Sequence, residues 1–394
     1  MSYNSVDISK TLPGGASADS AHLPQVHQAD RSTAQLSGEL EDVRLALASA
    51  MTQITEMRRG VTAVDEFLRS LSTTVLSRPG HPAPPANPES IYQEALRQVP
   101  RWHFSMLNDI ERNDAFAVAL ERRVRPGSHV LDIGSGTGLL AMMAVQAGAG
   151  KVTSCEGNPL LAEITRRVIA EHGLSDRVTV IPRMSTDLRV GVDLAEPADL
   201  IVSEIVDCGL IGEGILPTIQ HARKHLLAPG GTLLPERSTL TAALVDSKVV
   251  DGLNRVTSAA GFDVRLFNEV ATRGHFPVRL PTWPHRILSE PVDLVSFDFE
   301  HDSLDDGSVD LSVPVLADGV AHGAVAWFSM ELGGGIVLRN SPDNLGSHWM
   351  QAFVPLPEPI PVHRGQSFEF TIEWREERLW ATFPQASERA EVTR

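Results

Sequence analysis

The sequence predicts an α/β domain built on a parallel sheet, followed by an antiparallel β domain and preceded by a long N-terminal helix. Three patterns predict this order. Apolar residues recur at heptad spacing over residues 34–77, strands and helices alternate between residues 128 and 234, and short alternating strands follow from residue 236. With 394 residues, the chain is long enough for two or three units with buried cores.

The N-terminal region divides into three stretches of different composition. Residues 1–30 are rich in Ser, Gly, Asp and His without hydrophobic periodicity, which predicts a disordered tail. Residues 31–78 carry apolar a and d positions, which predicts a long helix or coiled coil for oligomerisation. The alternative is two helices, broken at Gly60, that pack on the core of the same subunit. Residues 79–90 contain five prolines and are typical of a stiff linker.

The next region, residues 91–235, has the alternation of a parallel sheet covered by helices on both faces. We expect strands at residues 128–133, 151–156, 177–182, 199–204 and 231–234, and helices at residues 138–148, 159–172 and 215–227. The sequence pattern changes at residue 236. Residues 236–394 contain short segments of alternating apolar and polar residues, such as STLTAALVD and SFEFTIEW, which predict antiparallel strands of a barrel or sandwich. Residues 250–285 interrupt this pattern and are expected to project as an arm.

The composition excludes several classes of partner. A formal net charge of −16 repels phosphate backbones and favours cationic partners, so we expect no nucleic acid. No apolar run approaches the roughly 20 residues of a membrane span, and the N-terminus lacks a signal-peptide core, so we expect no membrane partner. The two cysteines cannot form a disulfide framework, which favours the cytoplasm, and no metal site is expected.

A glycine-rich loop lies between the first predicted strand and helix. Gly134, Gly136 and a third glycine two residues later permit positive φ and a close approach of the backbone to a ligand. Leu139 stands where a dinucleotide fingerprint needs its third glycine, which disfavours a pyrophosphate. Asp132 precedes the loop, and Glu156 ends the second strand, where it can accept hydrogen bonds from ribose hydroxyls. The pattern favours a nucleoside without phosphate, such as S-adenosyl-L-methionine.

Two glutamates follow the fourth predicted strand. Glu204 and Glu213 stand nine residues apart, beginning at the strand's C-terminal end, where open α/β sheets bind ligands. Two carboxylates can grip the planar N–H fork of a guanidinium. Free guanidinium has a pKa above about 12 and is a poor nucleophile, so catalysis must orient it and localise its charge. Glutamates in loops usually lie on the solvated surface, but their position after the fourth predicted strand favours a pair of carboxylates that clamps a guanidinium.

With these residues the chain resembles the protein arginine methyltransferase family over roughly residues 91–394. Glu204 and Glu213 match the family's double-glutamate loop at its spacing. The segment 347–349, Ser-His-Trp, corresponds to the family's Thr-His-Trp motif, and the segment 102–113 resembles the helix that closes over the cofactor. The resemblance implies a Rossmann-like methyltransferase domain followed by an antiparallel β-barrel, with S-adenosyl-L-methionine as the cofactor.

The resemblance also assigns roles to cofactor-binding residues. Arg112 is expected to pair with the cofactor's carboxylate, and His103 to contact the cofactor beside it. Met184 and Ser185 are expected to lie against the adenine, although many family members have an acidic residue where Ser185 stands. Met106 is expected to shape the space around the transferred methyl group. Arg112, His103, Met184 and Ser185 thus join the predicted cofactor-binding residues Asp132, Gly134, Gly136 and Glu156, whereas Met106 is assigned to substrate binding.

Further implied roles concern the substrate side. Asp109 and His348 are expected to form a pair that links the cofactor-binding helix to the barrel and is a possible proton acceptor. Trp349 is expected to wall the substrate pocket. Within the family, the motifs Trp-His-Phe-x-Met and Gly-Glu-Gly-x-Leu-Pro are most similar to those of the monomethylating, type III branch. Since the family dimerises through an arm, a homodimer is expected.

The expected function is methyl transfer to the guanidino group of free L-arginine, giving Nω-monomethyl-L-arginine for natural-product biosynthesis. The first alternative is a protein substrate, represented by an arginine-containing peptide. An alternative of another class is a non-catalytic coiled-coil scaffold. A nicotinamide-dependent oxidoreductase is opposed by Leu139 and by the lack of an obvious hydride-transfer site in the sequence.

Overall fold

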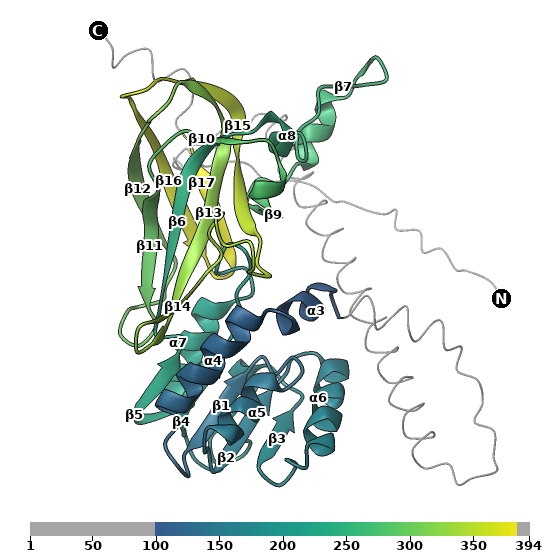
Figure 1. The fold of residues 1–394 in the computed structure, drawn as a ribbon, viewed down its shortest axis with the longest axis vertical. Helices are drawn as coiled ribbons and strands as arrows, with labels where there is room; N and C mark the ends of the chain where they lie inside the picture. Colours follow the sequence, from purple (N-terminus) through teal and green to yellow (C-terminus); the bar gives the residue numbers. More distant parts are fainter. Residues whose placement is uncertain (1–98, 384–394) are drawn as a thin grey trace, which may run out of the picture. The chain divides into compact units, whose positions relative to one another are not determined.

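The computed structural model describes residues 99–383, which all belong to one unit, Ala63–Arg394 (Figure 1). The predicted tail, coiled-coil helix and linker of residues 1–90 lie outside these described residues and stay predictions. No helix within residues 99–383 is long and apolar enough to cross a membrane.

Five parallel strands form the sheet of the first domain, in the order β3-β2-β1-β4-β5. They are β1 (His129–Ile133), β2 (Lys151–Cys155), β3 (Val178–Ile181), β4 (Ala198–Ser203) and β5 (Leu227–Leu234). Every residue of β1 is buried, as expected for the central strand of a sheet covered on both faces. The order reverses between β1 and β4, which creates a topological switch point where such sheets bind ligands.

Five helices accompany this sheet: α3 (Trp102–Leu107), α4 (Ile110–Arg123), α5 (Leu139–Gln146), α6 (Pro159–Glu171) and α7 (Ile215–His225). Asp109 caps α4, because its side chain accepts a hydrogen bond from the backbone N–H of Arg112. Asn158 caps α6 in the same way, and a proline follows it at the first helical position. Helix α4 contacts α5 in the first domain and β13 and β14 in the second, so it is shared between them.

The second domain is antiparallel, as predicted. One seven-stranded sheet contains β6 (Arg237–Asp246), β9 (Phe276–Val278), β10 (Arg286–Ile287), β11 (Val292–Asp298), β13 (Gly319–Gly333), β14 (Ile336–Arg339) and β15 (Gln351–Val362). A three-stranded sheet contains β12 (Gly307–Pro314), β16 (Ser367–Arg375) and β17 (Arg378–Thr382). One buried hydrophobic cluster runs through both sheets and the first domain. Since the ladders make two sheets, closure into a barrel stays a prediction.

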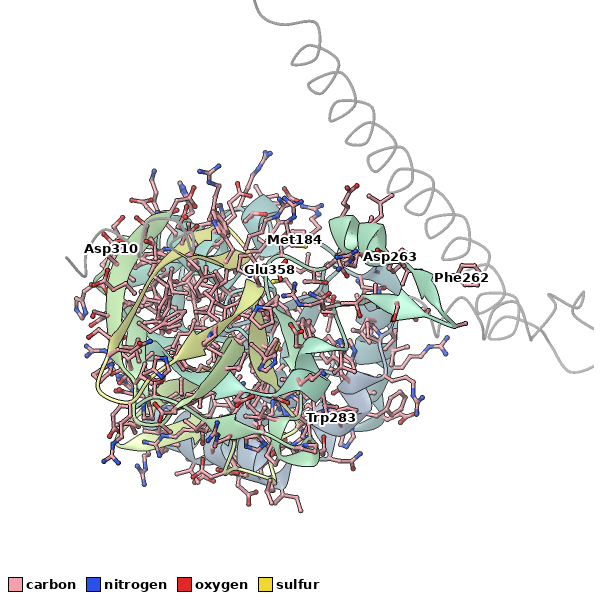
Figure 2. All side chains as sticks on the ribbon, turned by 90° about the horizontal axis from the view of Figure 1, so that it is seen from above. Met184, Phe262, Asp263, Trp283, Asp310 and Glu358 are labelled. Atoms are coloured by element: carbon pink, nitrogen blue, oxygen red, sulfur yellow. The ribbon has the colours of Figure 1, made fainter. Side chains whose placement is uncertain are left out.

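A projecting segment interrupts the second domain, as Figure 1 shows around α8 and β7. It contains α8 (Lys248–Asp251), the short strands β7 (Ser258–Ala259) and β8 (Phe262–Asp263), and the 3-10 helix η2 (Arg265–Val270). Figure 2 shows Phe262 and Asp263 at the outer edge of this segment.

The range predicted for the arm, residues 250–285, extends too far at its C-terminal end. Phe276–Val278 forms β9 and pairs with β15, so it belongs to the seven-stranded sheet. Val278 and Leu280 are buried in a small cluster with Phe353, and η3 (Leu280–Thr282) follows. Burial of these apolar side chains against β15 returns the chain to the domain after residue 275.

Candidate active site

The glycine loop and the first clamp glutamate meet at the switch point of the parallel sheet. Ile133 pairs with both Cys155 and Ser203, so Gly134, Glu156 and Glu204 follow three adjacent strand ends. A Cβ at Gly134 would lie 2.7 Å from the side chain of Ile205, which shows how closely the two loops approach. The structure therefore brings together residues that the sequence separates by 70 positions.

The glycine loop adopts backbone conformations that favour glycine. Gly134 has φ +84° and Gly136 has φ +54°. A Cβ at Gly136 would make ordinary van der Waals contact with the tip of Met106, 4.0 Å away. Met106 itself is buried and faces the loop from α3. The loop and Met106 thus lie against each other, and their contact with a ligand stays a prediction.

Two acidic residues support this loop in different ways. Glu156 accepts the N–H of Gly136 through Oε2 at 3.1 Å and the N–H of Asn158 through Oε1 at 2.8 Å. Each oxygen keeps a lone pair for a ribose hydroxyl. Asp132 has no exposed surface, and its Oδ2 accepts a hydrogen bond from Ser154 at 2.7 Å. Burial raises the pKa of Asp132 to about 6, so this side chain supports the loop from beneath.

The predicted adenine contacts lie beside Glu156. Met184 is 56% exposed, and its sulfur lies so close to Gly157 that any side chain there would collide with it. Ser185 is buried and begins the 3-10 helix η1 (Ser185–Asp187). An exposed thioether next to a carboxylate that can bind ribose fits a flat apolar base. The donors and glycines at this edge therefore fit S-adenosyl-L-methionine.

His103 lies on α3 at the edge of the site. Its ring stacks on Trp102 with centroids 3.8 Å apart, and its Nδ1 lies 2.9 Å from the carbonyl oxygen of Pro100. Trp102 is 44% exposed and Phe104 is 63% exposed. Apolar rings on this short helix thus remain available to cover a ligand.

Arg112 and Glu204 form a buried ion pair. The Nε and Nη2 atoms of Arg112 both donate to Oε2 of Glu204, at 2.9 and 2.5 Å, and each side chain is only 4% exposed. Burial raises the pKa of Glu204, and the Arg112 charge opposes this effect. The sequence predicted a different partner for Arg112, the cofactor's carboxylate. The observed pair shows that Glu204 can hold a guanidinium in this pocket.

Glu213 stands at the opposite end of the loop, with an exposed side chain. Surrounding protein and the charges of Glu204 and Asp207 raise the pKa of Glu213 to about 8. Three carboxylates within one short loop create a negative potential. A cation that reaches Glu213 would relieve this repulsion, which is the chemistry predicted for the clamp.

Asp109 and His348 form the predicted pair across 239 positions of sequence. Oδ2 of Asp109 lies 2.8 Å from both the backbone nitrogen and Nδ1 of His348, and both side chains are buried. Burial raises the pKa of Asp109, but hydrogen bonds from Arg112 and His348 lower it more, to below its ordinary value. Burial lowers the pKa of His348 to about 4, so this ring is neutral at neutral pH.

Trp349 packs against the glutamate loop. Its ring lies 4.0 Å from the ring of His348, and its Nε1–H donates to the carbonyl oxygen of Val206 at 3.1 Å. Only 6% of Trp349 is exposed. This residue therefore fixes the loop between the two clamp glutamates.

Comparison with known proteins decides the family. The chain is 56% identical over 286 residues to the arginine N(omega)-methyltransferase of Streptomyces achromogenes subsp. streptozoticus, covering 73% of this chain and 79% of that protein. The chain belongs to the protein arginine methyltransferase family. The family model described as the arginine methyltransferase oligomerization subdomain matches residues 236–383, and that of ribosomal protein L11 methyltransferase matches residues 117–234.

Other members of the arginine methyltransferase family share less of their length with the chain. Protein arginine N-methyltransferase 1.6 of Arabidopsis thaliana is 34% identical, and the match covers 58% of this chain and 34% of that protein. Protein arginine N-methyltransferase 7 of Drosophila ananassae is 31% identical, with 70% and 46% covered. The chain thus spans less than half the length of these two relatives.

Solved structures of arginine methyltransferases share the fold. The Trypanosoma brucei PRMT1 enzyme-prozyme heterotetrameric complex with AdoHcy has a TM-score of 0.62 at 22% identity, covering 72% of this chain and 94% of that chain. Arabidopsis thaliana protein arginine methyltransferase 10 has a TM-score of 0.57 at 23% identity, covering 68% and 86%. As a family member, the chain is an S-adenosyl-L-methionine-dependent arginine methyltransferase, which sets aside the scaffold and oxidoreductase alternatives.

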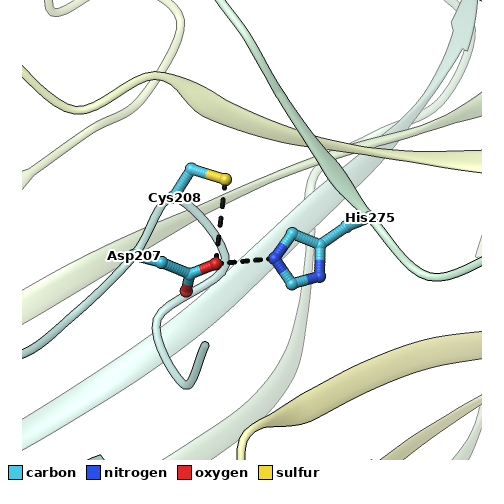
Figure 3. A group of neighbouring side chains, drawn as sticks. All are labelled: Asp207, Cys208 and His275. Carbon is cyan, nitrogen blue, oxygen red and sulfur yellow. Dashed lines mark hydrogen bonds and ion pairs between the residues drawn. The ribbon is translucent and has the colours of Figure 1, made fainter. Parts of the chain in front are cut away.

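Two residues outside the double-glutamate loop, Asn340 and His275, hold it in place, and the sequence did not reveal either of them. Asn340 is fully buried, and its Nδ2 donates to the carbonyl oxygens of Cys208 and Met350, at 3.2 and 2.7 Å. Oδ2 of Asp207 lies 2.7 Å from Nε2 of His275, and Figure 3 shows this contact as a dashed line. No local pattern marks Asn340 or His275, because their partners in this loop, Cys208 and Asp207, lie 132 and 68 positions away in the sequence.

Proposed function

We propose that this enzyme transfers one methyl group to a guanidino nitrogen of free L-arginine, giving Nω-monomethyl-L-arginine for natural-product biosynthesis. The observation that supports this substrate is the 56% identity to a Streptomyces enzyme named for arginine. Relatives named protein arginine N-methyltransferase are 30–36% identical, and the chain covers less than half of the length of each. A protein substrate is the alternative outcome of the experiment below.

We propose that the cofactor binds over the glycine loop, with its ribose on Glu156 and its adenine against Met184. Arg112 would pair with the cofactor's carboxylate, since its Nη1 and Nη2 atoms keep donors beyond those used on Glu204 and Asn113. When bound, the sulfonium supplies an electrophilic methyl group. His103 and its aromatic neighbours would cover the site and exclude water.

The clamp acts on the substrate by position and charge. Glu204 is partly neutralised by Arg112, so Glu213 supplies the second negative charge that a guanidinium needs. Two carboxylates on one side of the guanidinium draw positive charge toward themselves and leave the opposite nitrogen more nucleophilic. Holding that nitrogen in line with the methyl group removes most of the entropic cost of encounter.

Methyl transfer to a guanidinium produces a dication, which must lose one proton. The predicted acceptor was the Asp109–His348 pair, yet the pKa of His348 is only about 4, which makes this ring a weak base. The carboxylate of Glu213, with a pKa of about 8 before the cation binds, is the stronger base beside the substrate. We therefore propose that Glu213 accepts the proton, while Asp109 and His348 join α4 to the β domain.

The experiment incubates the full chain with S-adenosyl-L-methionine and either L-arginine or an arginine-glycine-rich peptide, followed by mass spectrometry. The proposal expects a single added methyl group on L-arginine and an unmodified peptide. Glu213→Gln should abolish turnover while keeping cofactor binding, whereas Glu171→Gln, at an exposed glutamate on α6, should behave like wild type. Methylation of the peptide alone would show that the substrate proposal is wrong.

We also propose that the enzyme is a homodimer through its arm. Four large apolar side chains of the arm are at least 70% exposed: Phe262, Leu266, Phe267 and Val270. Such a cluster is unusual on a surface without a partner. Phe267→Asp should convert the dimer to a monomer in light scattering of the full chain. If the dimer persists, the N-terminal heptads become the better candidate for the contact.

A further inference from the structure

Three side chains with polar or sulfur atoms gather beside the double-glutamate loop. Asp207 and Cys208 lie within this loop, and His275 comes from the C-terminal end of the arm, directly before β9 (Figure 3). Oδ2 of Asp207 is 2.7 Å from Nε2 of His275, and the two side chains are 23% and 12% exposed. This is an ion pair largely removed from water, which joins the catalytic loop to the arm.

The hydrogen-bond partners of His275 determine its protonation state. Nε2 faces the carboxylate of Asp207, and the ring also donates to the backbone carbonyl of Leu379 on β17. Neither partner atom can donate, so both ring nitrogens must carry hydrogen. Burial lowers the pKa of His275, but the Asp207 carboxylate and the Leu379 carbonyl raise it more, to above its ordinary value.

The loop leaves room for this pair at two glycines. A Cβ at Gly209 would lie 2.6 Å from Nε2 of His275, and a Cβ at Gly212 would collide with the carboxylate of Asp207. The N–H groups of both glycines donate to Oδ1 of Asp207, at 3.0 and 2.9 Å. Asp207 is therefore held from two sides, with the backbone of its own loop on one oxygen and the arm on the other.

We propose that His275, as an imidazolium, is a positioning residue that fixes the double-glutamate loop through Asp207 and couples the arm to the arginine clamp. The inference rests on the proposed role of Glu213, which follows Gly212 directly. Protonated His275 also offsets the charge of Asp207, one of the carboxylates that repels the ionised form of Glu213. Loss of the imidazolium should therefore disturb both the position of the clamp and its charge.

A metal ion is the competing interpretation, because the ligand atoms of Asp207, Cys208 and His275 lie within 4.8 Å of one another. A metal would have to displace the hydrogen on Nε2 of His275. It would also need the thiolate of Cys208, whose pKa is raised by burial and by Asp207. The existing contacts provide hydrogen-bond partners for Asp207 and His275 without an ion. We therefore favour a protonated His275 over a metal ion at this site.

The proposal predicts a pH dependence with a defined sign. When His275 loses its proton, the neutral ring keeps one N–H for two acceptors, so a lone pair faces either Asp207 or the carbonyl of Leu379, and the positive charge that offsets Asp207 is lost. Asp207 and Cys208 are the titratable groups that face the ring from the loop, and β17 presents the carbonyl of Leu379. Ionisation of Glu213 should raise kcat/KM as the pH increases. Loss of the His275 proton should then lower kcat/KM again at alkaline pH.

The test compares kcat and KM against pH in the full-length wild type, His275→Gln, His275→Ala and the control His285→Gln. Glutamine keeps one N–H donor for Asp207 but does not titrate. We expect His275→Gln to lose the alkaline fall while keeping kcat within several-fold, and His275→Ala to lose about tenfold or more in kcat/KM. His285 is exposed and binds only the nearby carbonyl of Trp283, so its variant should match wild type.

Three outcomes decide the proposal. An unchanged alkaline fall in His275→Gln would overturn it, and so would disappearance of the fall when the wild type is treated with a chelator. An NMR titration of the His275 imidazole gives a readout independent of substrate. A pKa above 6.5 supports the imidazolium even if L-arginine proves not to be the substrate, and a pKa below it refutes the inference.

Discussion

Binding of a guanidinium to the clamp should expel a proton from Glu213. Desolvation by the surrounding protein and the charges of Glu204 and Asp207 raise the pKa of this carboxyl group to about 8, so it is mostly protonated in the free enzyme at neutral pH. The cation binds the ionised form and stabilises it. Substrate binding and proton release are therefore linked.

The number of protons released on binding follows from the pKa of Glu213. With a pKa of about 8, roughly nine tenths of Glu213 carries a proton at pH 7. If an adjacent cation lowers that pKa by two units or more, binding releases on the order of 0.8 to 0.9 proton per site. Affinity for the cation should then rise about fivefold between pH 7 and pH 8, as the ionised fraction of the free enzyme increases.

The assay is calorimetric titration of L-arginine into the enzyme saturated with S-adenosylhomocysteine, in phosphate and in Tris at pH 7. These buffers differ in ionisation enthalpy, so the change in apparent binding enthalpy counts the protons released. Glu213→Gln should release none, while the exposed control Glu171→Gln should match wild type. A wild-type count near zero, or a full count in Glu213→Gln, would refute the reasoning.

Further predictions concern the clamp, the loop and stability. Glu204→Gln leaves Arg112 without its buried carboxylate partner and should reduce kcat/KM about 100-fold or more in initial-rate assays, so near-normal turnover would contradict the clamp. Gly134→Ala strains a φ of +84° and collides with Ile205, so calorimetry should find S-adenosylhomocysteine binding weakened by about 1–3 kcal/mol, and unchanged binding would argue against this loop as the cofactor site. His348 has its pKa lowered to about 4, below its unfolded value, so the stability that it contributes is present above pH 6.5 and lost as pH falls through 4. Urea unfolding should show a decrease of up to about 3 kcal/mol over that range, absent in His348→Gln.

Local patterns in the sequence were sufficient to predict the parallel-sheet domain and its loop. Strands such as β1 are buried on both faces and therefore read as continuous apolar runs, and positive φ at Gly134 and Gly136 requires glycine. The position of Glu204 after β4 followed from the rule that ligands bind at the carboxyl ends of parallel strands. These features depend on neighbouring residues, so a single sequence contains them.

Contacts between distant residues were decided by the tertiary structure. Arg112 and Glu204 are 92 positions apart, and only the packing of α4 over the sheet makes the guanidinium and the carboxylate a pair. The arm ends before β9 because Phe276–Val278 finds a partner strand in β15, which the local sequence could not specify. His275 is brought to Asp207 by the same return of the chain. Composition and periodicity determined which elements form and which residue types face a ligand. The surrounding protein that raises the pKa of Glu213 and the partner that holds Asp207 exist only when elements far apart in sequence pack together.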